Sequence, residues 1–177
     1  MLSMSITRRL IVVPLANNNH GKTTMLSELV RQAARRDLKK VQRGLYTFTS
    51  PWGRKVEALV FIRSYQETLQ GEHGPVESAL SAIDKSWFQR DLIIFPSHID
   101  EEHCKEIISV GKAAGFDLIV VPVVMKSSEL GKYAGCLKLA WDMRWTISND
   151  ATDDHNAQVE ALGHDLWTWI ASAIENR

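Results

Sequence analysis

The stretch RRLIVVPLANNNHGKTTMLSELV, residues 8–30, decides the fold of this 177-residue chain. Its apolar run at 10–15 is short and continuous, which is typical of a β-strand covered on both faces. The asparagines at 17–19 favour a turn. From residue 22 to residue 33 apolar side chains recur with the period of a helix. The stretch therefore predicts a buried strand, a loop and an amphipathic helix in direct succession.

The rest of the chain continues this alternation of short apolar runs and longer amphipathic segments. We expect strands at 9–15, 44–50, 55–64, 91–97, 117–125 and 144–149, and helices at 22–37, 74–90, 100–115, 129–142 and 153–175. Such an order predicts an α/β fold, a three-layer α/β/α sandwich with a mostly parallel central sheet. Because no repeat, linker or low-complexity segment divides the sequence, we expect a single domain spanning residues 1–177.

The segment ANNNHGKT, residues 16–23, has the spacing of a relaxed phosphate-binding loop: a small residue, four variable ones, then Gly-Lys-Thr. Backbone N–H groups in such a loop, and at the start of the following helix, hold phosphate oxygens. Gly21 allows close backbone approach and Lys22 reaches the β- and γ-phosphates. The hydroxyl of Thr23 ligates Mg²⁺, and Thr24 can contact the α-phosphate.

In its position between a strand and a helix, this segment resembles the loop of the P-loop NTPase superfamily, with Ala16 where the family usually has glycine. The resemblance covers residues 10–33. It implies a P-loop NTPase-like fold and ATP with Mg²⁺ as cofactors. The nucleotide-binding residues it implies are Asn17, Asn18, Asn19, His20, Gly21, Lys22, Thr23 and Thr24.

The loop and two features elsewhere in the chain bear on which nucleotide is bound. HGKTT is similar to the loop of translational GTPases, and ANNNHGKTTM to that of partition-type ATPases. The chain has no Asn-Lys-x-Asp, the element that reads guanine in GTPases, so ATP is favoured over GTP. The strand expected at 144–149 belongs to the sheet edge that abuts the base in P-loop folds. Asn149 is therefore a candidate base contact, with capping of the last helix as the alternative.

The acid that completes the Mg²⁺ shell in P-loop proteins is missing from its usual place. The expected strand at 91–97 ends in Pro96 and Ser97 instead. Asp100, a few residues later, is the candidate for this metal ligand and a catalytic residue together with Lys22. Its alternative role is to cap the helix that follows.

Charge is distributed unevenly, although the formal net charge is zero. Residues 1–55 hold eleven Lys or Arg and two acids, whereas the remainder holds ten bases and nineteen acids. The basic stretch at 31–55 is either a solvated face or a contact for nucleic acid or an acidic protein. A second copy of the chain, as a homodimer, is a further expected partner.

Composition narrows the cellular setting. No apolar run is long enough for a bilayer span, so we expect no membrane insertion. Cys104 and Cys136 have no paired spacing, which favours a reducing cytoplasm.

Three functions remain open. The first is an ATP- and Mg²⁺-binding NTPase whose nucleotide state controls contact with a protein or nucleic-acid partner. The second is a kinase-like phosphotransferase acting on a nucleotide, polynucleotide or small molecule. The third is a non-enzymatic interaction module with an inert nucleotide site.

Overall fold

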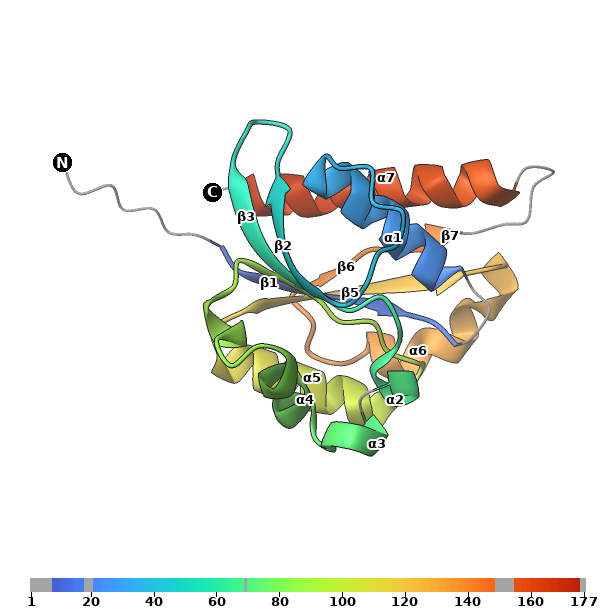
Figure 1. The fold of residues 1–177 in the computed structure, drawn as a ribbon. Coiled ribbons are helices and arrows are strands. Elements are labelled where there is room, and N and C mark those ends of the chain that lie inside the picture. The colour runs from blue at the N-terminus through green and yellow to red at the C-terminus, as the bar shows by residue number, and fades with distance from the viewer. Residues whose placement is uncertain (1–7, 18–20, 69, 149–154, 176–177) are drawn as a thin grey trace.

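The computed structural model describes residues 8–17, 21–68, 70–148 and 155–175, which form an α/β fold with a mixed, mostly parallel sheet (Figure 1). The strands are β1 (Leu10–Leu15), β2 (Gly44–Thr49), β3 (Lys55–Val60), β4 (Leu92–Ile94), β5 (Asp117–Val124), β6 (Met143–Arg144) and β7 (Ile147–Ser148). The α-helices are α1 (Lys22–Ala34), α2 (Tyr65–Thr68), α3 (Gln70–His73), α4 (Val76–Ile83), α5 (Glu101–Ala113), α6 (Ala134–Leu137) and α7 (His155–Glu175). Two 3₁₀ segments are η1 (Trp87–Gln89) and η2 (Ser127–Tyr133).

The strand order places β1 in the interior of the sheet. Neighbouring strands follow the order β2-β3-β4-β1-β5-β6, and β7 pairs with the end of β5. All pairs are parallel except the β2–β3 hairpin. Within β1, Val12 pairs with Ile94 on one side and with Ile119 on the other. The chain after β1 therefore leaves the sheet between the carboxyl ends of two parallel strands.

Helices cover both faces of this sheet (Figure 1). On one face α1 and α7 lie side by side, and Leu26 and Leu166 are fully buried in the core between them and the strands. On the other face α4, α5 and the shorter helices enclose a second core, which includes Phe95 and Ile107. Burial on both faces accounts for the continuous apolar runs of β1 and β5.

Most long elements confirm the sequence expectations. The helix expected at 22–37 begins at Lys22 and ends at Ala34, and that expected at 100–115 corresponds to α5. The two strands joined by the turn PWGR form the β2–β3 hairpin. No helix among the described residues is long and apolar enough to cross a membrane.

Other boundaries were wrong. The helix expected at 74–90 ends at Ile83, because the Asp84 carboxylate accepts from the backbone N–H of Ser86 and pairs with Arg90, 2.7 Å away. The helix expected at 129–142 is instead η2 followed by the single turn of α6.

The strand expected at 55–64 ends at Val60, and residues 65–68 form α2, which the sequence pattern did not predict. The strand expected at 91–97 is regular only over 92–94, with an isolated parallel bridge between Ser97 and Leu15 beyond it, and that at 144–149 is split into β6 and β7. After β3 and β4 the chain instead bonds to residues distant in sequence: the backbone N–H of Tyr65 donates to Pro96, and that of Ser97 donates to Pro14.

Candidate functional site

The loop after β1 and the first turn of α1 form the centre of the candidate site. The chain leaves β1 at Ala16, which is fully buried, and enters α1 after Gly21. Gly21 has φ 78° and ψ 7°, a left-handed conformation that glycine adopts without the cost of a Cβ atom. Of the predicted phosphate-loop residues, Asn18, Asn19 and His20 lie outside the described residues.

The amino end of α1 carries no compensating negative charge of its own. Gly21 supplies no side-chain cap, and the first turn contains no acidic residue. The N–H groups and the positive end of the helix dipole consequently favour an anion at this point. Thr23 and Thr24 are exposed on the same turn, where their hydroxyls are accessible to a ligand.

Lys22 folds back from the start of α1 into the protein and is only 7% exposed. Its Nζ donates to the backbone carbonyl of Ala16 and, over 2.7 Å, to Oγ of Ser64. Burial lowers the pKa of Lys22 to about 8, while the negative charge of Glu67 partly opposes this shift. A buried ammonium bonded to two neutral oxygens remains poorly compensated, so an incoming anion would stabilise its charged form.

The segment after β4 lies beside this loop. It carries Ser97 in place of the acid that would complete a Mg²⁺ shell. Backbone bonds join Ala16 to Ser97 (N to O, 3.2 Å) and Ser97 to Pro14 (N to O, 3.0 Å). Ser97 is fully buried; its Oγ donates to the carbonyl of His98 and accepts from Nε2 of Gln66. The loop is also tied here through Asn17, whose Oδ1 accepts from the backbone N–H of Ile99.

Asp100 caps α5. Its Oδ1 accepts from the backbone N–H of His103 at 3.0 Å, and its Oδ2 lies 3.1 Å from Nδ1 of the same residue. The backbone bond from His103, followed by the charge of that ring, holds the pKa of Asp100 below its ordinary value. Of the two roles expected for Asp100, the structure thus shows the helix cap, and the metal ligand stays a prediction.

The first turn of α2 supplies site residues that the sequence pattern did not identify. Ser64, just before α2, bonds to Lys22, and Gln66 bridges to the segment after β4 by accepting from the backbone N–H of His98. Glu67 places its Oε1 3.2 Å from Nε2 of His98. In the sequence, Ser64, Gln66 and Glu67 are marked only as polar residues near the end of a strand. Such residues can reach a common site because the carboxyl ends of parallel strands meet at one edge of the sheet.

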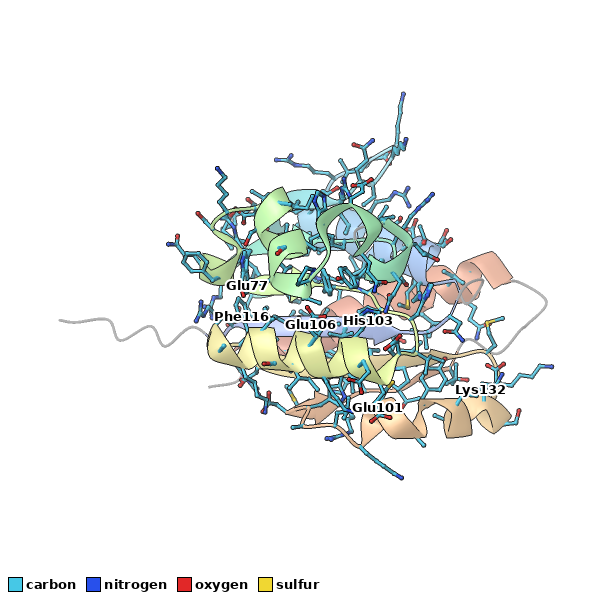
Figure 2. All side chains as sticks on the ribbon, turned by 90° about the horizontal axis from the view of Figure 1, so that it is seen from below. Glu77, Glu101, His103, Glu106, Phe116 and Lys132 are labelled. Atoms are coloured by element: carbon cyan, nitrogen blue, oxygen red, sulfur yellow. The ribbon has the colours of Figure 1, made fainter. Side chains whose placement is uncertain are left out.

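α5 links the carboxyl edge of the sheet to the other helices that cover the same face. Figure 2 shows His103 and Glu106 on the side of α5 toward α2–α4, with Glu101 on the opposite side. Nε2 of His103 lies 2.7 Å from Nε2 of Gln70, and Oε1 of Glu106 accepts from the backbone N–H of Val76. These contacts hold the short helices near the candidate site.

Two further expectations, a base contact and a metal ion, are not tested by these contacts. Asn149, the candidate base contact, lies outside the described residues. In the described part of the chain, no three His, Cys, Asp or Glu side chains gather into a group suited to hold a metal. A Mg²⁺ ion held by Thr23 and nucleotide phosphates would not require such a group, because Mg²⁺ in triphosphate sites is bound by few protein ligands.

Comparison of the chain with protein-family models, with curated proteins and with solved structures found no match.

Proposed function

We propose that the chain binds a nucleoside triphosphate, ATP with Mg²⁺, at the loop between β1 and α1, and that the bound nucleotide controls contact with a partner. The observation that carries the proposal is the buried ammonium of Lys22, held by two neutral oxygens beside an uncapped helix start. A triphosphate would supply the negative charge that this position lacks.

The residues present divide the tasks of binding. The N–H groups at the start of α1 would contact phosphate oxygens, and Lys22 would neutralise their charge. Thr23 would supply a metal ligand. Since Ser97 stands beside the loop in place of a carboxylate, the proposal is stronger for binding than for hydrolysis.

The contact between Lys22 and Ser64 gives nucleotide binding a route to the rest of the molecule. Ser64 is fully buried and immediately precedes α2. A phosphate group that draws Nζ of Lys22 toward itself would weaken the 2.7 Å bond to Ser64. The segment 63–68 would then change its position or stability with the state of the nucleotide.

Calorimetry with Lys22→Ala tests the proposal. Removing the ammonium should weaken binding of Mg-ATP by about 10- to 100-fold, the size of a charge-assisted bond. Lys138→Ala removes an exposed lysine elsewhere and should leave the affinity unchanged. Circular dichroism verifies that both variants are folded, and unaltered ATP affinity in folded Lys22→Ala would refute the proposal.

Hydrogen exchange tests the route through Ser64. Addition of a non-hydrolysable ATP analogue with Mg²⁺ should change the exchange of amides in residues 63–68 in the parent protein. The same addition should leave them unchanged in Lys22→Ala. Exchange in this segment that is insensitive to bound nucleotide would contradict control of a partner through α2.

A further inference from the structure

A basic hollow of about 410 Å³ lies beside the candidate nucleotide site. One wall is the loop that leads from α1 into β2, and the other is the segment that follows β3. Three cations line it: Lys40 and Arg43 from the first wall and Arg63 from the second. Buried Val41 and Phe61 contribute its apolar part.

Within the part of the chain that the structure describes, the side chains of the three cations in the basic hollow have no partner. Among the described residues, none forms a hydrogen bond or ion pair with the side chain of Lys40, Arg43 or Arg63, and no acid lines the hollow. Elsewhere in the chain, by contrast, Arg31 pairs with Glu28 and Arg90 with Asp84. The hollow therefore concentrates positive charge that is available to a ligand.

The loop that forms the first wall adds further positive charge around the hollow. The loop 35–43 contains five basic residues against one acid, Asp37. All three cations of the basic hollow are exposed to solvent, so the hollow is open. Small-molecule sites usually enclose most of their ligand, whereas a series of backbone phosphates can pass across an open surface and meet several cations.

We propose that the basic hollow binds the backbone phosphates of a nucleic acid, with Lys40, Arg43 and Arg63 as the contacting residues. This inference rests on the proposed function, since it names the partner whose contact the nucleotide controls. Arg63 and Thr68 line the hollow, and Ser64 between them bonds to Lys22. One segment thus touches both the candidate nucleotide site and the proposed nucleic-acid surface.

Fluorescence anisotropy of labelled oligonucleotides, single-stranded and duplex, tests this surface. The double variant Lys40→Glu with Arg43→Glu, both outside the 63–68 segment, is compared with Lys85→Glu plus Lys138→Glu, which changes net charge equally at exposed lysines outside the hollow. We expect the hollow variant to bind at least about tenfold more weakly at about 50 mM salt, and to show a shallower salt dependence. The control variant should stay within about twofold of the parent protein.

Several outcomes would overturn the inference. Equal loss in both double variants would show only a general effect of net charge, and absence of binding at low salt would exclude nucleic acid. Binding of polyglutamate in place of either oligonucleotide would identify an acidic protein surface as the partner.

Calorimetry separates this inference from the proposed function. The hollow variant should keep the ATP affinity of the parent protein, because it leaves Lys22 and the loop intact. If Lys22→Ala leaves ATP affinity unaltered while the hollow variant alone loses nucleic acid, the proposed function fails and the nucleic-acid surface stands. If Lys22→Ala loses ATP affinity while the hollow variant binds nucleic acid as well as the parent protein does, the nucleic-acid surface is refuted and nucleotide binding stands.

Discussion

Lys22 is buried at the carboxyl end of the sheet, and its environment makes its charge sensitive to pH. Two neutral oxygens accept from its Nζ, and burial lowers its pKa to about 8. The free protein therefore loses the Lys22 proton as pH rises through about 8, well below the range of an exposed lysine. A bound phosphate would raise the same pKa by favouring the charged form.

The affinity for Mg-ATP should consequently fall as pH rises through about 8. Below this pH the ammonium is already charged and affinity should change little. Above it, binding must take up a proton, and affinity should fall by about tenfold between about pH 7 and about pH 9. Calorimetry in buffers of different ionisation enthalpy measures both the affinity and the proton uptake.

Lys22→Arg provides the matched control for this prediction. Arginine stays protonated throughout this range, so whatever affinity the variant retains should vary little with pH. An equal decline in Lys22→Arg and the parent protein would assign the pH dependence to another group.

At the scale of elements, the beginning of α5 distinguishes two roles for one side chain. Asp100 caps this helix through the backbone N–H of His103, and the sequence also offered it as a Mg²⁺ ligand. Asparagine caps helices about as well as aspartate but carries no charge. The two roles are therefore separable by substitution.

Asp100→Ala should lower the free energy of unfolding by about 1 kcal/mol through loss of the cap, and Asp100→Asn should cost only a few tenths. Chemical denaturation measures both values. If Asp100 acts only as a cap, Asp100→Asn also keeps Mg-dependent ATP affinity. A selective loss of that affinity in Asp100→Asn would instead support the metal-ligand role.

At the scale of the whole molecule, the first and last helices meet through a glycine. A Cβ atom at Gly163 in α7 would lie 2.6 Å from the backbone oxygen of Met25 and 3.1 Å from the backbone nitrogen of Leu29, both in α1. Backbone atoms cannot move aside as a flexible side chain does. The close packing of α7 on α1 therefore requires the absence of a side chain at this position.

Gly163→Ala should lower the free energy of unfolding by about 1–3 kcal/mol, although alanine favours a helix more than glycine does. A Cβ atom at Gly71, in α3, would have no other atom within 4 Å. Gly71→Ala should therefore leave the free energy of unfolding unchanged or raise it slightly. Denaturation curves of the two variants measure the difference. An equal response would show that α7 can shift away from α1 at little cost.

The sequence predicted the elements whose cause is local. β1, α1, α5 and the β2–β3 hairpin followed from apolar periodicity, turn residues and a stop at Gly115. It did not predict α2, because residues 65–68 carry no distinct helical pattern and Tyr65 is held by packing on Phe95 and by a backbone bond to Pro96. The same limit applies to the candidate site, in which Lys22 was identified but Ser64 and Glu67 were not.

By itself, then, the sequence determined an α/β chain in which a glycine and a lysine open the helix after a buried strand. These features depend on the identity and spacing of neighbouring residues, which set backbone conformation and amphipathic faces. Only the tertiary structure placed β1 between β4 and β5, buried Lys22 against Ser64, set Ser97 beside the loop and joined two walls into the basic hollow. Those relations depend on which strands pair and which helices pack, and contacts between residues far apart in the chain decide them.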